Sequence, residues 1–265
     1  MMPDNGEKVA CAISIEKLSK VYGTKKKELI ALDDVDMTIN KGEFVCIVGT
    51  SGCGKSTLLN IIAGFEPPTG GNVLLNGKPI HTPGADRGVV FQTYTLFPWL
   101  TVEKNIQYGL KIKGKRKDEM DAITKDYLEK IHMQRFAKML PKELSGGMKQ
   151  RVAIARTLAN QPEVLLMDEP FGALDAQTKS QMQVLIHEIW QNDKPTIFFI
   201  THDIEEAVFL ASKIYVMSAN PGRVCEEVHT GLPECRDLQI KDTAEFIHWK
   251  NYVRDVLYSY KADKY

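Results

Sequence analysis

Residues 49–56 read GTSGCGKS and fit the spacing G-x-x-x-x-G-K-[ST] in full. Glycines let the backbone curl so that successive N–H groups point at phosphate oxygens, and a following helix adds the positive end of its dipole. In such a loop the lysine reaches the β and γ phosphates of a nucleotide, and the serine hydroxyl binds Mg²⁺. The expected phosphate-binding residues are Gly49, Thr50, Ser51, Gly52, Cys53, Gly54, Lys55, Ser56 and Thr57.

Two carboxylates form a second candidate site directly after the apolar run 164–167. Asp168, at the end of a buried strand, suits a hold on Mg²⁺. Glu169 beside it is placed to orient or deprotonate a water that attacks the γ phosphate. A solvated acidic turn after a strand would have the same pattern. The phosphate-binding loop elsewhere in the chain favours the catalytic interpretation.

Three single residues carry weaker signals. His202 follows a strand-like run and could contact a γ phosphate, but the same stretch could simply start a helix capped by Asp203 or Thr201. Gln92 also follows a strand, where a glutamine is usually just polar. Tyr22, beside a glycine turn, could stack on an adenine or pack against the protein.

A further glycine-and-serine cluster lies far downstream of the phosphate-binding loop, in LSGGMKQRVAIAR at 144–156. Ser145, Gly146 and Gly147 would open a helix, and a helix N-terminus favours an anion. The alternative is that these residues only cap the helix. The residues alone leave both interpretations open.

The elements around these motifs indicate an α/β fold. After residue 144 helical and strand-like segments alternate, as expected for a mostly parallel sheet with helices on its faces. A helical block over about 93–155 interrupts this core, and 242–260 has a helical pattern. The expected strands are 13–23, 29–39, 43–49, a hairpin over 72–80 with its turn at Asn76-Gly77, 88–91, 164–167, 196–200 and 213–217.

The composition excludes several classes of protein. Lys and Arg number 34 and so do Asp and Glu, so no net field predicts binding to nucleic acid or an anionic membrane. No apolar run is long enough to span a bilayer. The five cysteines include no C-x-x-C pair, which favours a reduced compartment. Because Cys53 lies inside the phosphate-binding loop, alkylation of its thiol is expected to block turnover, and ATP to protect it.

Taken together, these motifs resemble the ATP-binding cassette (ABC) ATPase family from about residue 13 to about residue 228. The resemblance rests on Tyr22, GTSGCGKST, Gln92, LSGGMKQR, VLLMDEP, GALD at 172–175 and His202, in this order. It implies a P-loop NTPase core with a mostly parallel sheet, an N-terminal antiparallel β subdomain and an inserted helical subdomain. The cassette is expected over 13–235, with a C-terminal helical extension over 236–265.

The resemblance also implies a role for each motif. ATP and Mg²⁺ are the expected cofactors, with Ser56, Gln92 and Asp168 at the metal. Glu169 becomes the catalytic base and His202 the switch that senses the γ phosphate, acting with Lys55. The residues Ser145, Gly146, Gly147 and Asp175 are expected to close over the ATP of a second copy, so that a head-to-tail homodimer encloses two ATPs.

Two departures from the family pattern mark a subgroup. Met148 stands where the family usually has a glutamine, and Gly172 opens a loop that usually begins with serine. Together with 97–105, 171–178 and 219–224, these residues resemble the nitrate/sulfonate/taurine importer group. That group implies membrane-spanning permease subunits docked near 93–101, an indirect external solute-binding protein, and a peripheral position on the cytoplasmic face of the inner membrane.

Three rival functions remain weaker. A soluble cassette ATPase acting on ribosomes or in DNA repair usually carries two fused cassettes or a long coiled-coil insertion, and this sequence shows neither. A P-loop metabolic kinase would have no use for the LSGG motif. A GTP-specific switch would need an N-K-x-D motif, which does not occur.

Overall fold

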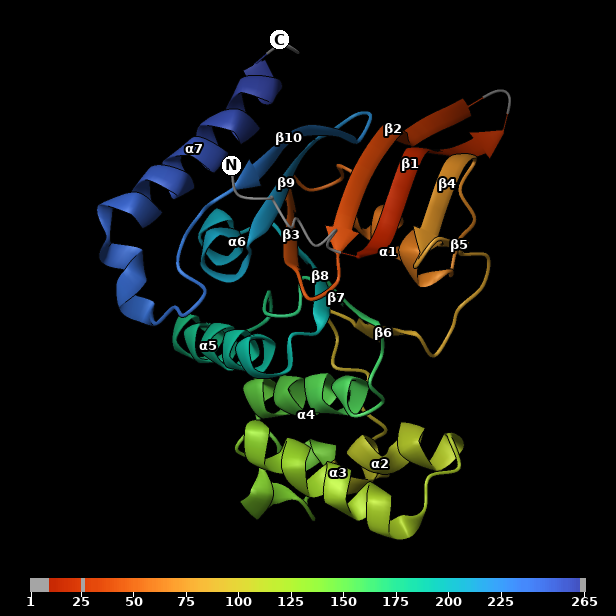
Figure 1. Ribbon diagram of the computed structural model, residues 1–265, viewed down its shortest axis with the longest axis vertical. Helices are drawn as coiled ribbons and strands as arrows, with labels where there is room; N and C mark the ends of the chain where they lie inside the picture. The colour runs from red at the N-terminus through yellow and green to blue at the C-terminus, as the bar shows by residue number, and fades with distance from the viewer. Residues whose placement is uncertain (1–9, 25–26, 263–265) are drawn as a thin grey trace, which may run out of the picture.

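Two β-sheets form one end of the molecule and a lobe of helices forms the other, as Figure 1 shows. The computed structural model describes residues 10–24 and 27–262. The smaller sheet is antiparallel, in the order β2-β1-β4-β5. Its strands are β1 (Cys11–Thr24), β2 (Lys27–Asn40), β4 (Gly70–Leu75) and β5 (Lys78–Pro79). The expected N-terminal antiparallel sheet is therefore confirmed.

The larger sheet has the order β10-β9-β3-β8-β7-β6 and is parallel except for its edge strand β10. Its strands are β3 (Phe44–Gly49), β6 (Arg87–Val90), β7 (Val164–Asp168), β8 (Thr196–Thr201), β9 (Lys213–Ser218) and β10 (Arg223–His229). The parallel strands match the expected runs closely. Strand β10 was not expected, because an edge strand with one solvated face includes charged residues that weaken its apolar pattern.

Helices cover the faces of the large sheet and build the separate lobe (Figure 1). Around the sheets lie α1 (Lys55–Ala63), α5 (Ala176–Asp193), α6 (Ile204–Leu210), η3 (Leu238–Asp242) and α7 (Ala244–Ala262). The lobe consists of α2 (Val102–Ile112), α3 (Lys117–Lys130), η1 (Gln134–Phe136), η2 (Pro141–Glu143) and α4 (Gly146–Leu158). No helix among the described residues has the length and apolar character needed to cross a membrane.

Strand β3 shows why the large sheet holds its position. All six of its residues are buried, and the first five alternate between two hydrophobic clusters on opposite faces of the sheet. Phe44, Cys46 and Val48 belong to one cluster, and Val45 and Ile47 to the other. A parallel strand covered on both faces reads as a continuous apolar run, which is the pattern seen in the sequence.

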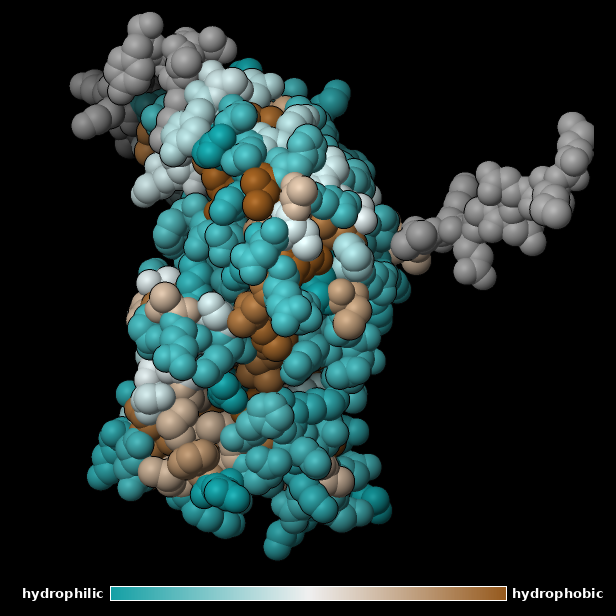
Figure 2. All heavy atoms as spheres, turned by 90° about the vertical axis from the view of Figure 1, so that its left-hand side faces the viewer, coloured by the Kyte–Doolittle hydropathy of each residue, from teal (hydrophilic) through white to brown (hydrophobic). Residues whose placement is uncertain are grey.

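The C-terminal segment packs back onto the core. Helix α7 buries Phe246 and Val253 against the same cluster as Phe44. Before it, the buried Arg236 guanidinium donates hydrogen bonds to the carbonyls of Val208 (3.1 Å), Phe209 (2.9 Å) and Ala211 (2.9 Å), which satisfies the C-terminal end of α6. Figure 2 shows the side of the molecule that carries α7: hydrophilic side chains dominate, with a narrow hydrophobic band between them.

The histidine at 187 predicts a pH dependence of stability. His187 on α5 is 1% exposed, packs between Trp190 and Phe209, and finds no hydrogen-bond partner for either ring nitrogen among the described residues. Burial lowers the pKa of His187 from 6.5 to about 4. The unfolded chain therefore takes up a proton below pH 6.5 that the folded chain refuses until near pH 4. Lowering the pH from 7 to 5 therefore reduces the free energy of unfolding by about 2 kcal/mol.

Between pH 7 and pH 5 the free energy of unfolding of His187→Leu should fall by about 2 kcal/mol less than that of the natural chain, because leucine takes up no proton. Urea unfolding at pH 7 and pH 5 measures the difference. His81→Gln, which changes an exposed histidine, should keep the natural pH dependence. Equal pH dependence in His187→Leu and the natural chain would contradict the prediction.

Candidate functional site

The phosphate-binding loop joins the end of β3 to the start of α1. Gly52 and Gly54 adopt left-handed φ angles of 78° and 92°. A side chain at Gly54 would also approach the Ala31 carbonyl oxygen within 2.8 Å. The glycine pattern therefore has a conformational and a steric cause, as the motif requires.

Lys55 is folded inside this loop. Its side chain is 6% exposed, and its ammonium donates to the carbonyl oxygens of Gly49 at 2.8 Å and Thr50 at 3.1 Å. An ammonium has three N–H donors, and its third neighbour here is the weak acceptor Cys53 Sγ at 3.8 Å. The loop thus holds a positive charge that retains capacity to donate to an anion.

The side chain of Cys53 points into the protein, contrary to the expectation that reagents reach it. It is fully buried and belongs to the hydrophobic cluster around Val45 and Ile47. Burial raises the pKa of the Cys53 thiol, although the nearby Lys55 ammonium opposes this. A buried thiol that stays protonated reacts slowly. The backbone N–H of Cys53 donates to the Thr50 carbonyl at 3.2 Å, and Cys53 is not among the described residues that line the pocket over the loop.

A pocket of about 290 Å³ lies over the loop. Eight of the predicted site residues line it, from Tyr22 through the loop to Glu169. Four lining residues were not predicted: Leu29, Ile30, Ala31 and Asn220. The sequence contained no signal for them, because only the structure shows that the large apolar residues Leu29 and Ile30 remain 61% and 48% exposed.

Tyr22 stands at the wall of this pocket. Its hydroxyl donates to Glu66 Oε2 at 2.6 Å, and the Lys20 ammonium lies 5.0 Å from its ring centroid. Lys20 and Glu66 also form an ion pair at 3.1 Å. The ring is therefore held by the nearby Lys20 and by Glu66, which is distant in the sequence, and neither contact was predicted.

Asp168 and Ser56 meet below the loop. The Ser56 hydroxyl donates to Asp168 Oδ1 at 3.3 Å. Burial raises the pKa of Asp168, with the Ser56 bond acting against it and the Glu169 charge adding to it. Gln92 lies near Glu169: its amide nitrogen is 3.3 Å, and Glu169 Oε2 is 3.9 Å, from the position that a Cβ atom on Gly172 would take. The structure thus gathers hydroxyl, carboxylate and amide groups around Glu169.

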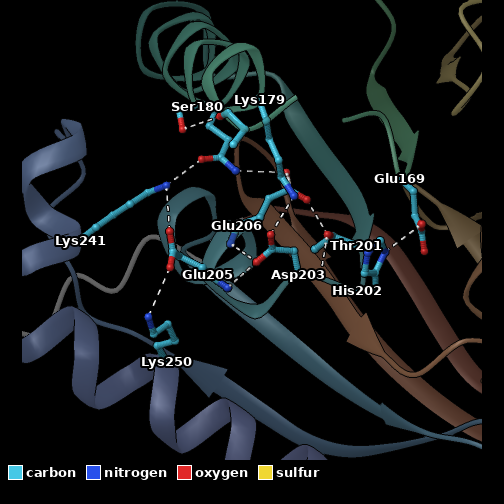
Figure 3. Close-up of polar contacts among 12 residues, drawn as sticks. Glu169, Lys179, Ser180, Thr201, His202, Asp203, Glu205, Glu206, Lys241 and Lys250 are labelled. Carbon is cyan, nitrogen blue, oxygen red and sulfur yellow. Dashed lines mark hydrogen bonds and ion pairs between the residues drawn. The ribbon is translucent and has the colours of Figure 1, made fainter. Parts of the chain in front are cut away.

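Glu169 faces His202 across the ends of β7 and β8. Its Oε2 lies 3.0 Å from His202 Nδ1, as Figure 3 shows. Glu169 has a left-handed φ of 42°, and its backbone N–H donates to the Ile200 carbonyl at 3.0 Å. A non-glycine residue in that conformation at a strand end often belongs to a functional site.

The capping alternative for this stretch is also confirmed. Asp203 accepts hydrogen bonds from the backbone N–H groups of Glu205 (2.9 Å) and Glu206 (3.2 Å) and so caps α6. His202 is not needed as the cap, and its side chain is 61% exposed toward Glu169. Asp203 therefore provides the helix cap, and the His202 side chain faces Glu169 instead.

The LSGG cluster lies on a separate surface. Ser145 is exposed and caps α4 by accepting from the Met148 N–H at 3.3 Å. Gly147 packs closely against Thr178, because a Cβ atom on Gly147 would lie 2.4 Å from Thr178 Cγ2. The backbone N–H of Thr178 donates to Asp175 at 2.9 Å, so Asp175 lies at the start of the neighbouring helix α5. Within the described part of the chain, Ser145, Gly146, Gly147 and Asp175 are not among the residues that line the pocket over the phosphate-binding loop.

The aromatic segment after Gln92 borders a groove of about 420 Å³ between the lobe and the core. Phe97 packs on Tyr108, with ring centroids 4.3 Å apart, and lies under the Arg156 guanidinium. The buried Asn105 fixes the segment by accepting from the Phe97 N–H and donating to its carbonyl. Packing of Phe97 is therefore confirmed, whereas Trp99 remains 72% exposed.

Comparisons with known proteins agree with this geometry. Residues 32–172 match the family described as ABC transporter. The chain is 47% identical over 251 residues to the nitrate import ATP-binding protein NrtD of Synechocystis, covering 92% of this chain and 94% of that protein. It is 45% identical over 258 residues to the bicarbonate transport ATP-binding protein CmpD of the same organism, covering 96% and 91%.

A solved structure shows the same fold. It is the dimeric structure of a post-hydrolysis state of an ATP-binding cassette bound to ADP and Pi. The match has a TM-score of 0.71 at 34% identity and covers 82% of this chain and 98% of the other.

The position of Cys53 predicts a pattern of thiol labelling. In the folded chain N-ethylmaleimide should modify the exposed Cys11 and Cys235 first, and leave the buried Cys46 and Cys53 unmodified until the chain is unfolded. Peptide mapping by mass spectrometry, with and without guanidinium, measures this order. Labelling of Cys53 in the folded chain as fast as Cys235 would show that its thiol is accessible after all.

Proposed function

This chain belongs to the ABC transporter family, and we propose that it is the ATP-hydrolysing subunit of a membrane importer. In this proposal the binding and hydrolysis of ATP in a head-to-tail dimer drive the uptake of a small solute. The observation that carries it is the meeting of the phosphate-binding loop, Asp168, Glu169 and His202 at one edge of the parallel sheet.

The nucleotide would lie in the pocket over the loop. Loop N–H groups and the Lys55 ammonium would bind its phosphates, and the Tyr22 ring would lie against its adenine. The oxygen-rich set of Ser56, Asp168 and Gln92 suits Mg²⁺, which protein carboxylates and nucleotide phosphates commonly hold together. Bound there, Mg²⁺ would neutralise charge on the phosphates.

Hydrolysis would depend on Glu169 and His202. As the general base, the Glu169 carboxylate would accept a proton from the water that attacks the γ phosphate. His202, 3.0 Å from that carboxylate, would contact the γ phosphate and hold Glu169 in place. Both side chains project from the ends of neighbouring strands, so their spacing is set by the sheet.

A second copy of the chain would complete each site. The exposed Ser145 at the N-terminus of α4, Gly146, Gly147 and Asp175 would close over the ATP of the partner copy, because a helix N-terminus stabilises an anion. The similar dimeric cassette supports this arrangement. Met148 fits it as well, since its side chain packs against the hydrophobic core and its backbone N–H serves the cap.

Permease subunits that span the membrane would bind in the groove beside Phe97. The exposed side chains of Trp99 and Ile112 lie beside or in this groove and would add apolar contacts. The chain would then lie peripherally on the cytoplasmic face of the inner membrane, and an external solute-binding protein would act through the permease. The names of NrtD and CmpD favour a small oxyanion such as nitrate or bicarbonate as the solute. No nucleic acid is needed for this function.

Replacing the catalytic base should trap the dimer. We expect Glu169→Gln to bind ATP normally, to hydrolyse it roughly 10²- to 10⁴-fold more slowly, and to elute as a dimer in Mg-ATP. Turnover assays and size-exclusion chromatography with light scattering measure both effects. Glu163→Gln, which changes an exposed acid immediately before β7, is the matched control and should behave like the natural chain. An ATP-bound Glu169→Gln chain that remains monomeric would refute the dimeric site.

The importer proposal also predicts a membrane partner. Affinity purification of the chain from gently solubilised native membranes should recover a multi-spanning protein at comparable stoichiometry. Trp99→Glu should reduce this recovery, because it places a charge beside the groove, while ATP hydrolysis by the isolated chain stays unchanged. Recovery of ribosomal or DNA-repair proteins without a membrane protein would overturn the transport function and leave the ATPase.

A further inference from the structure

A buried carboxylate lies behind the turn that carries His202. Glu206 on α6 is 2% exposed. It accepts hydrogen bonds from Thr201 Oγ1 at 2.5 Å and Gln183 Nε2 at 3.2 Å, and the Lys179 ammonium lies 3.6 Å away. Burial raises the pKa of Glu206, and these three neighbours oppose the rise. A buried carboxylate depends on every one of its partners, because water cannot replace them.

These bonds fix the residues on both sides of His202. The Thr201 hydroxyl donates to Glu206 and accepts from the Asp203 N–H at 3.0 Å. Asp203 also accepts from the Lys179 ammonium at 2.8 Å. The His202 side chain is itself 61% exposed. Its position over Glu169 is therefore set by the backbone of this turn rather than by packing of the imidazole.

The C-terminal segment reaches this network through one lysine. Lys241 on η3 donates to Gln183 Oε1 at 2.9 Å, while the other end of the same amide donates to Glu206. Because an ammonium can only donate, Lys241 holds the amide with its nitrogen toward Glu206. Figure 3 shows the resulting chain from Lys241 to the strand end that carries His202.

A second lysine provides a natural comparison. Lys241 and Lys250 both pair with Glu205, each at 3.3 Å. Within the described residues, Lys250 makes its polar contact with Glu205. Lys241 alone of these two also binds Gln183. The pair therefore separates a general effect of tethering the C-terminal segment from an effect on the network behind His202.

We propose that Lys241 is a positioning residue for ATP hydrolysis, acting through Gln183, Glu206 and Thr201 on the turn that carries His202. The inference rests on the proposed role of His202 and makes the segment after residue 235 part of the hydrolytic apparatus. Without Lys241 the oxygen of the buried Gln183 amide would lose its donor, and the amide would be held only by its bond to Glu206. The amide would then move to find another donor for its oxygen, which would weaken its bond to Glu206 and shift the Thr201–Asp203 turn.

The kinetic test compares Lys241→Met, Lys241→Arg and Lys250→Met with the natural chain. We expect Lys241→Met to lower kcat for ATP by about threefold to tenfold, which corresponds to about 0.7–1.4 kcal/mol, with KM within about twofold. The loss should appear in kcat because Lys241 acts on the position of His202 and lies outside the nucleotide pocket. Lys241→Arg should restore most of kcat, since it keeps the donor, and Lys250→Met should leave kcat unchanged. Similar kcat values for Lys241→Met and Lys250→Met would overturn the proposal.

Gln183→Leu tests the path through the amide. If Lys241 acts through Gln183, the double variant Lys241→Met/Gln183→Leu should lose no more kcat than Gln183→Leu alone. Multiplied losses in the double variant would show that Lys241 acts independently of Gln183 and would refute the path. Thermal unfolding of each variant shows whether a loss of kcat reflects a loss of folded protein.

A spectroscopic measurement separates this inference from the proposed function. The imidazole resonances of His202, assigned by their loss in His202→Gln, should shift in nucleotide-free Lys241→Met and stay in place in Lys250→Met. Unchanged His202 resonances in Lys241→Met would refute the positioning role even if the chain hydrolyses ATP. If the natural chain hydrolyses no ATP, the proposed function fails, and the resonances still decide whether Lys241 positions His202.

Discussion

The parallel hydrogen-bond ladder of the large sheet is the constraint on which the site depends. Strand β3 pairs with β8 from Phe44↔Ile197 to Val48↔Thr201, and β7 pairs with β8 up to Asp168↔Ile200. Parallel strands end at the same edge, so a fixed register places the phosphate-binding loop, the carboxylates and His202 within reach of one another. Because these strands are buried on both faces, a slip in register would expose apolar side chains and leave backbone groups unpaired.

The edge of the sheet supplies positions, and local backbone conformations turn the side chains toward one another. Gly52 and Gly54 take left-handed angles that suit glycine, whereas Glu169 takes one that is uncommon for its type. The Ile200 carbonyl binds the Glu169 N–H and holds that conformation. The strain is therefore offset by the neighbouring strand, and the carboxylate meets His202 as a result.

The residues that we expect to bind nucleotide lie on two separate surfaces of the chain. The loop, Asp168 and Glu169 surround one pocket, while Ser145 and Asp175 cap the starts of α4 and α5 elsewhere. In the proposed dimer the second surface would contact the ATP of the partner copy, and the similar dimeric cassette is consistent with this arrangement. The chain of hydrogen bonds from Lys241 to Thr201 would make the C-terminal segment a third contributor to the same reaction.

The N-terminal antiparallel sheet was expected from the family resemblance. Local sequence patterns were enough to predict the phosphate-binding loop, the paired acids after β7, the mostly parallel sheet and the helical lobe. Each of these depends on residues close together in the chain or on a single repeating period, and such signals survive without knowledge of the fold. The direction of the Cys53 thiol, the partners of Tyr22 and the pocket wall at Asn220 depend on how distant segments pack. The same holds for the path from Lys241 to His202, whose members come from η3, α5, α6 and β8. Only tertiary structure decides such contacts, because hydrogen bonds between residues far apart in the chain leave no period or spacing in the sequence.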